Sequence, residues 1–70
     1  MKIRESIILE LLRAKPGRYI LHDMGDYTMK EADGTDVLVD GELVKPWHNH
    51  MDALEGAGKL ICDGSKYRLA

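Results

Sequence analysis

Apolar residues in the first fifteen positions of the chain repeat with the period of an α-helix. They recur at spacings of three and four and so share one side of a helix: Ile3, Ile7, Ile8, Leu11 and Leu12. Pro16 and Gly17 interrupt the pattern, since proline cannot continue a helix and glycine suits the residue that follows one. The pattern therefore predicts a helix over about residues 2–15.

The dipeptide Asp-Gly marks three later positions in the chain, the second of them at residues 40–41. Between β-prone residues it is a strong hairpin signal, because a type I′ turn needs positive φ at both central residues. Here a hairpin would place Leu38 opposite Leu43 and Val39 opposite Glu42. The match of the two leucines across the strands favours this hairpin.

The third Asp-Gly, at residues 63–64, predicts a C-terminal hairpin in which Cys62 faces Ser65 and Leu60 faces Tyr67. Strand alternation divides its side chains between two faces. The face toward the core is expected to carry Leu60, Cys62, Tyr67 and Leu69, and the outer face Lys59, Ile61, Lys66 and Arg68. The sequence thus predicts a half-buried hairpin with a basic outer face.

The first Asp-Gly, at residues 33–34, lies in a segment that allows two interpretations. A hairpin there would place Glu31 opposite Asp36, which is a like-charge pair. Alternatively, the run from Thr28 to Glu31 is typical of a capping box that opens a very short helix. A strand is the preferred interpretation, and residues 19–22 are also predicted to form a short strand.

A second helix is predicted over about residues 46–56. Pro46 suits a first helical turn, and one side of the helix would carry Trp47, His50, Met51 and Leu54. Phenylalanine is absent, so the core is expected to consist of aliphatic residues, Trp47 and the three tyrosines. The order of helix, acidic hairpin region, helix and C-terminal hairpin predicts one small α+β domain over residues 1–70.

Composition sets the broad class of the protein. Hydrophobic residues at 44% and charged residues at 31% fit a soluble globular domain. The single cysteine, Cys62, excludes an internal disulfide and is typical of a reducing compartment. No apolar run approaches the ~20 residues of a membrane span, and Glu5, Glu10 and Arg13 interrupt the N-terminal run that begins like a signal peptide. We therefore expect a cytoplasmic protein without a membrane partner.

The net charge of −2 is unevenly distributed along the chain. Residues 1–22 carry a net charge of +3, residues 23–42 carry −6, and residues 43–70 carry +1. An acidic middle argues against nucleic acid coating the whole surface, but it leaves room for a local basic face.

The stretch PWHNHMD, at residues 46–52, raises the question of a metal or nuclease site. On a helix, His48 and His50 point in directions about 200° apart, whereas helical zinc pairs stand at positions i and i+4. The spacing favours a solvent-facing His48 and a partly buried core His50. Cys62 and the serines have no histidine and acid at the spacing of a catalytic triad. The sequence predicts no catalytic residue, no metal and no cofactor.

The two ends of the chain, ILELLRAKPGRY and WHNHMDALEGAGKLICDGSKYRLA, resemble a winged helix-turn-helix domain. In that family a first helix ends at proline or glycine, a later helix runs into a GKL segment, and a two-stranded wing follows, here ending in KYRL. The resemblance covers residues 1–18 and 47–70. Where the family has a second helix before its recognition helix, this chain carries the acidic segment GDYTMKEADGTDVLVDGELV, which is typical of strand.

The resemblance implies a small non-enzymatic regulator of transcription that binds double-stranded DNA, and it leaves room for a homodimer. The recognition helix would be residues 46–56, from which Asn49 could read an adenine edge, although Asp52 and Glu55 would repel phosphate. The basic face of the wing would meet backbone phosphate. The candidate nucleic-acid-binding residues are Lys45, His48, Asn49, Lys59, Lys66 and Arg68.

The acidic middle of the chain supports an alternative from a different class, a protein-interaction module that acts as an adaptor or inhibitor. Residues 23–42 gather acids around two turns, and such a surface could dock on a protein partner with a basic surface. The same acids could instead serve only to discourage strand-to-strand aggregation. The candidate partner-binding residues are Asp33, Asp36, Asp40 and Glu42.

Overall fold

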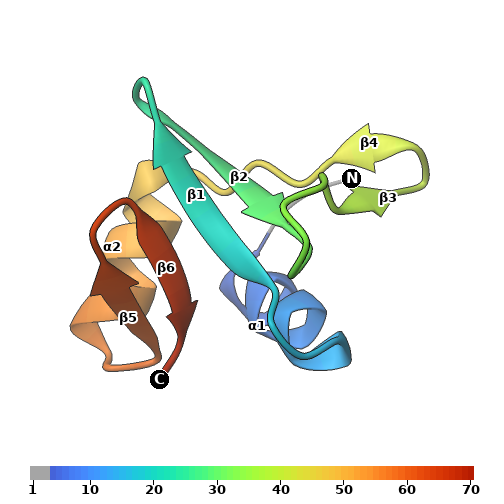
Figure 1. The fold of residues 1–70 in the computed structure, drawn as a ribbon. Coiled ribbons are helices and arrows are strands. Elements are labelled where there is room, and N and C mark those ends of the chain that lie inside the picture. Colours follow the sequence, from blue (N-terminus) through green and yellow to red (C-terminus); the bar gives the residue numbers. More distant parts are fainter. Residues whose placement is uncertain (1–3) are drawn as a thin grey trace.

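Helix α1 is the first element of the computed structural model, which describes residues 4–70 (Figure 1). The described chain has an α+β architecture of helices and antiparallel strands, as the sequence predicts. Its elements, in chain order, are α1 (Glu5–Ala14), β1 (Tyr19–Asp23), β2 (Asp26–Lys30), β3 (Leu38–Val39), β4 (Glu42–Leu43), α2 (His48–Gly56), β5 (Leu60–Asp63) and β6 (Lys66–Leu69).

Helix α1 confirms the first prediction over residues 5–14, while residues 1–3 lie outside the described part of the chain. Glu5 in its first turn and Arg13 in its last turn both complement the helix dipole. The face that packs on the sheet is rotated relative to the predicted stripe. Ile8, Leu9 and Leu12 are its buried residues.

Four strands form the main sheet in the order β2-β1-β6-β5, with antiparallel pairing throughout. Strand β1 confirms the strand predicted at residues 19–22, and it lies between two partners. It joins β2 through Met24 and Gly25, which have φ values of 51° and 83°, as a type I′ turn requires. The sequence did not indicate this hairpin, because methionine is an unusual residue for such a turn.

The segment around the first Asp-Gly is a strand followed by a loop, so the short helix opening at Thr28 is wrong. The backbone of Met29 donates to the Val44 carbonyl and accepts from the Val37 amide, at 3.0 and 3.1 Å, and these bonds hold the segment extended. Lys30 rather than Glu31 lies opposite Asp36, so the predicted like-charge pair does not form.

The hairpin predicted around residues 40–41 is confirmed, with Leu38 opposite Leu43 and Val39 opposite Glu42. Asp40 and Gly41 both have positive φ, at 53° and 78°. This β3–β4 hairpin projects from the rest of the molecule in Figure 1. Its flanking residues bond to Met29 and thereby cover part of the outer edge of β2.

The C-terminal hairpin exists, but its predicted register is wrong. Leu60 pairs with Leu69 and Cys62 with Tyr67, so the turn consists of Gly64 and Ser65. Gly64 has a φ of +67°, and Ser65 does not share the positive φ that a type I′ turn would need. Because the register moves by two residues, the side chains within β5 and β6 keep their predicted faces. Lys59, which was also predicted on the outer face, precedes β5 and lies beside α1 instead.

Cys62 is exposed, although its face of the hairpin was predicted to meet the core. It lies on the edge strand β5 near the turn, and its thiol donates to the Gly64 carbonyl at 3.3 Å. Of the residues on that face, Leu60 is buried and Tyr67 and Leu69 are half-buried. The hairpin therefore packs on the core mainly through its end away from the turn.

Helix α2 contributes Met51 and Leu54 to the core, as predicted. Trp47 is not a core residue, because 69% of its surface is exposed. It precedes the helix with an extended backbone, at φ −85° and ψ 154°, so its side chain does not follow the buried helical face. The core instead consists of aliphatic residues, two methionines and one tyrosine: Ile8, Leu9, Leu12, Ile20, Tyr27, Met29, Val37, Val44, Met51, Leu54 and Leu60.

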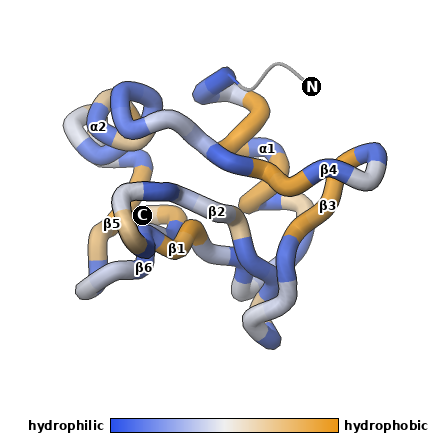
Figure 2. The backbone as a smooth tube through the Cα atoms, turned by 90° about the horizontal axis from the view of Figure 1, so that it is seen from above, coloured by the Kyte–Doolittle hydropathy of each residue, from blue (hydrophilic) through white to orange (hydrophobic). Residues whose placement is uncertain are grey.

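The backbone view coloured by hydropathy shows strongly apolar stretches on α1 and along the β3–β4 hairpin (Figure 2). Both helices of residues 4–70 are too short and too polar to cross a membrane.

Candidate nucleic-acid interface

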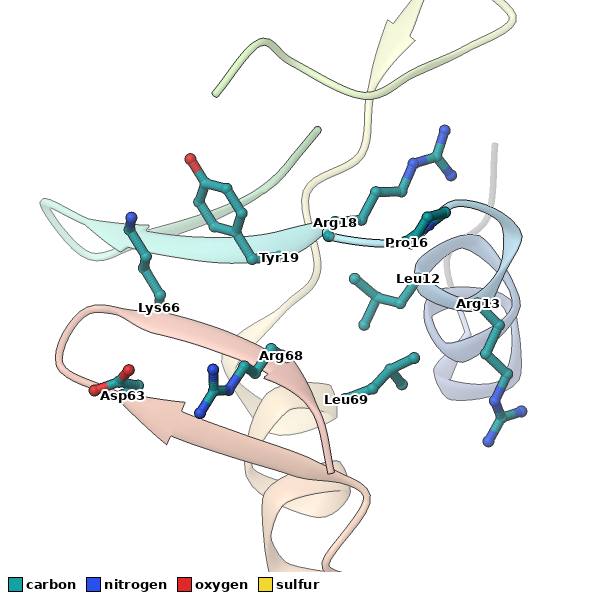
Figure 3. A pocket seen from close by; sticks show the side chains of 10 residues that line it. Leu12, Arg13, Pro16, Arg18, Tyr19, Asp63, Lys66, Arg68 and Leu69 are labelled. Atoms are coloured by element: carbon teal, nitrogen blue, oxygen red, sulfur yellow. The ribbon is translucent and has the colours of Figure 1, made fainter. Parts of the chain in front are cut away.

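An open groove lies between the C-terminal end of α1, the start of β1 and the β5–β6 hairpin (Figure 3). Its volume is about 630 Å³, which is within the range of sites that bind small organic ligands. Apolar side chains line it from both walls: Leu12 and Pro16 from the α1 side and Leu69 from β6. Tyr19 contributes the only aromatic ring among its lining residues.

Basic side chains surround this groove. Lys66 and Arg68 alternate with core-facing residues on β6, so both lie on the outer face of the hairpin. Arg13 stands at the opposite edge, in the last turn of α1. Asp63 is the one carboxylate in the lining.

The fourth basic residue of the groove, Arg18, is already paired. Its Nε and Nη2 donate to the two carboxylate oxygens of Glu31, at 2.8 and 3.1 Å, and its Nη1 donates to the Leu11 carbonyl at 2.7 Å. These contacts turn its guanidinium away from the groove, as Figure 3 shows. Arg18 is thus a structural residue, and its charge is neutralised by Glu31.

The other three cations remain available to a ligand. Within residues 4–70, Arg13 and Arg68 make no ion pair, and Lys66 places its Nζ 4.9 Å from the centroid of the Tyr19 ring. This cation–π contact holds the ammonium over the Tyr19 ring without neutralising it. The groove therefore has a net positive potential on a chain whose overall charge is −2.

Of the six residues predicted to bind nucleic acid, the structure brings only Lys66 and Arg68 together in this groove. Lys45 and His48 line a separate depression of about 270 Å³ beside Tyr27 and Trp47. Asn49 is exposed on α2.

Lys59 is also exposed, but it lies in a third depression with Glu5, Glu10 and Arg13 of α1. The two carboxylates reduce the positive potential around Lys59 and around Arg13.

The recognition-helix residues and the wing cations lie on opposite sides of the main sheet. Met51 and Leu54 of α2 pack on the side where Leu60 is buried. Lys66 and Arg68 alternate with the half-buried residues of β6 and so point away from that side. A DNA duplex that held α2 in its major groove would therefore not also contact Lys66 and Arg68.

The exposed face of α2 carries mixed chemistry. His48, Asn49, Asp52 and Glu55 are all exposed, so two acids accompany the two residues that could read bases. His50 is partly buried, as predicted, and its Nδ1 lies 3.9 Å from a carboxylate oxygen of Glu5. Among residues 4–70 no three histidine, cysteine or acidic side chains are grouped to hold a metal ion.

The four acidic residues of the alternative surface differ in their surroundings. Asp33 accepts hydrogen bonds from the hydroxyl and the backbone amide of Thr35, which lower the pKa of its carboxyl group. Asp36 pairs with Lys30. Asp40 occupies the turn of the projecting β3–β4 hairpin, and Glu42 lies on β4.

Two groove residues, Arg13 and Tyr19, were not singled out by the sequence. Arg13 lies off the apolar stripe of α1 and looks like any solvated helix residue. Tyr19 reaches the hairpin only because β1 pairs with β6, with Leu21 opposite Lys66, across more than forty residues of chain. A parity argument on β1 could have put Tyr19 on the outer face, but no local signal named β6 as its neighbour.

Comparison of the chain with protein-family models, curated proteins and solved structures finds no match.

Proposed function

We propose that this chain is a small, non-enzymatic nucleic-acid-binding regulatory protein that contacts phosphates through the groove between α1, β1 and the β5–β6 hairpin. The observation that carries the proposal is that three cations without an ion pair among residues 4–70, Arg13, Lys66 and Arg68, line one groove of an acidic protein. Such a cluster is the electrostatic footprint of a phosphate-binding surface.

The winged-helix form of this proposal is supported by the order of elements at the C-terminal end. Helix α2 runs directly into the β5–β6 hairpin, and β1 pairs with β6 of that hairpin. Strands rather than a helix occupy the chain between α1 and α2. The proposal therefore gives the phosphate contacts to the hairpin and the α1 end, and it assigns no base-reading role to α2.

The test is a binding titration of fluorescently labelled oligonucleotides, followed by anisotropy at several salt concentrations. If three phosphates are contacted, the logarithm of the association constant should fall with the logarithm of salt at a slope of roughly −2 to −3. The K66E/R68E double variant should lose binding. K59E reverses a charge on the same hairpin outside the groove and should bind nearly as the wild type does.

Equal binding by the wild type and the K66E/R68E variant would overturn the proposal. Binding that does not respond to salt would do the same, because phosphate contacts release counterions.

A second candidate function, partner binding through the acidic segment, has one specific observation in its favour. Leu38 and Leu43 form a cross-strand pair on the projecting hairpin, and 58% and 43% of their surfaces are exposed. Exposed leucines beside acidic residues are typical of a surface that binds a basic partner. If partners are captured equally by the wild type and by an L38S/L43S variant, this candidate fails.

A further inference from the structure

The groove has features that distinguish a single strand of nucleic acid from a duplex. A protein that binds single strands combines a positively charged track with an aromatic ring on which a base can stack. Here Tyr19 lies in the same groove as Lys66 and Arg68. In Figure 3 the side chains of Tyr19 and Lys66 point to the same side of the sheet, from neighbouring strands.

The dimensions of the site also favour a single strand. A groove of about 630 Å³ has room for an unpaired base, and Leu12, Pro16 and Leu69 give it apolar walls beside the cations. Lys66 and Arg68 are two positions apart on β6, which places their Cα atoms ~7 Å apart. That separation is comparable to the distance between successive phosphates of an extended strand.

The groove lacks what a duplex reader needs. No helix presents a basic face beside Lys66 and Arg68, because α2 packs on the other side of the sheet and exposes Asp52 and Glu55. A major groove is read by a helix or a two-stranded ribbon inserted into it. The β5–β6 hairpin is not a free ribbon of this kind, because β6 also pairs with β1 within the four-stranded sheet. The Tyr19 ring beneath the Lys66 ammonium would make no contact with the stacked bases of a duplex.

From these contacts we infer that the groove binds single-stranded nucleic acid, with one base stacked on Tyr19 and neighbouring phosphates held by Lys66 and Arg68. This inference rests on the proposed function and names its ligand class.

Binding would exchange one contact for two. The Lys66 ammonium leaves its place 4.9 Å from the centre of the Tyr19 ring and moves to a phosphate, and a base takes its place on the ring. Base stacking on an aromatic ring is the stronger interaction, because an exposed cation–π contact contributes little. Arg13 lies across the groove, in the last turn of α1.

The experiment measures the fluorescence anisotropy of three labelled probes at low salt. They are oligo-dT and oligo-rU of twelve nucleotides each and a mixed-sequence DNA duplex of twelve base pairs. Wild type, Y19F and Y19L are compared, with thermal unfolding of each variant as the check on folding. Y19F keeps the ring, whereas Y19L keeps an apolar side chain without a stacking surface.

The expected result is that oligo-dT or oligo-rU binds at least about tenfold more tightly than the duplex. Y19L should weaken single-strand binding by about tenfold, and Y19F should leave it unchanged. The ratio of oligo-dT to oligo-rU affinity tells which nucleic acid is preferred, and either preference supports the inference.

Two results would overturn the inference while leaving the proposed function intact. One is a duplex that binds as tightly as the single strands, and the other is a folded Y19L variant that binds single strands like the wild type. Absence of binding to all three probes would overturn the proposed function as well.

Discussion

Arg18 and Glu31 form a two-pronged ion pair that ties together three separate parts of the fold. The guanidinium donates to both carboxylate oxygens of Glu31, at 2.8 and 3.1 Å, just after β2 ends. Its third donor bonds to the carbonyl of Leu11 in α1. The side chain of Arg18 is only 9% exposed, so the pair is shielded and geometrically specific. It fixes the turn between α1 and β1, which is one wall of the groove.

The Arg18–Glu31 pair predicts an acid-sensitive contribution to stability. The hydrogen bond from Arg18, together with its positive charge, holds the pKa of Glu31 below the ordinary value of 4.5. A carboxylate with a lowered pKa in the folded state stabilises the protein above that ordinary value, and the contribution is lost as the pH falls through the folded pKa. E31Q should therefore be less stable than the wild type at neutral pH, with the difference shrinking below about pH 4.5.

Urea unfolding at a series of pH values measures this difference. The matched control is D36N, which removes the carboxylate of the more exposed Lys30–Asp36 pair. That variant should lose less stability at neutral pH, because exposed ion pairs contribute little. An E31Q variant whose stability deficit stays constant down to pH 3 would contradict the account of the pair.

Gly17 and Gly25 have nearly the same backbone conformation but different surroundings. Their φ values are 84° and 83°. A Cβ on Gly17 would lie 2.7 Å from the Cβ of Ala32, whereas one on Gly25 would meet nothing within 4 Å. G25A should lower the free energy of unfolding by about 1–2 kcal/mol, because alanine is strained in the left-handed conformation. G17A should cost clearly more, since the Pro16–Gly17 turn must also move away from Ala32.

Chemical denaturation of the two glycine variants separates conformational strain from steric contact. Equal losses of unfolding free energy would show that the close approach of the Pro16–Gly17 turn to Ala32 does not exist in solution.

Met24 occupies a left-handed conformation, with a φ of 51°, while 96% of its surface is exposed. Its side chain therefore contributes little packing to offset the conformational cost. M24N should raise the free energy of unfolding by about 1 kcal/mol, because asparagine tolerates this region of φ and ψ. M24A keeps a Cβ and should leave stability nearly unchanged. A loss of stability in M24N would indicate that Met24 makes contacts that the structure does not show.

Trp47 is the only tryptophan in the chain, so its fluorescence reports on one position. With 69% of its surface exposed, its emission should resemble that of indole in water and should be quenched by iodide. W47A should change stability by about 0.5 kcal/mol or less, compared with about 3–5 kcal/mol for a buried tryptophan. A blue-shifted emission that resists quenching would place Trp47 in the core after all.

Local signals in the sequence predicted most of the secondary structure. The apolar stripe ending at Pro16 marked α1, and Asp40-Gly41 marked both the β3–β4 hairpin and its register. At the other end of the chain, Gly64-Ser65 rather than Asp63-Gly64 forms the turn, so the same dipeptide gave the wrong register there. The β1–β2 turn at Met24 carried no recognisable signal, because its positive φ values occur at a residue that seldom adopts them.

The candidate site was only half predictable, for a reason of topology. Lys66 and Arg68 follow from strand alternation within one hairpin. Tyr19 and Arg13 join them through the pairing of β1 with β6 and the packing of α1, which are contacts between distant parts of the chain. Trp47 shows a related limit, since a helical spacing rule fails for a residue whose backbone precedes the helix.

We expect nucleic acid to bind in the groove rather than on α2. The most direct test is an amide chemical-shift titration of the isotope-labelled protein with oligo-dT at low salt, followed by a stepwise increase in salt. The expected result is salt-sensitive shifts of the amides of Arg13, Tyr19, Lys66 and Arg68, with the amides of α2 nearly unchanged. A spectrum that does not change, or shifts confined to α2 or to the β3–β4 hairpin, would contradict it.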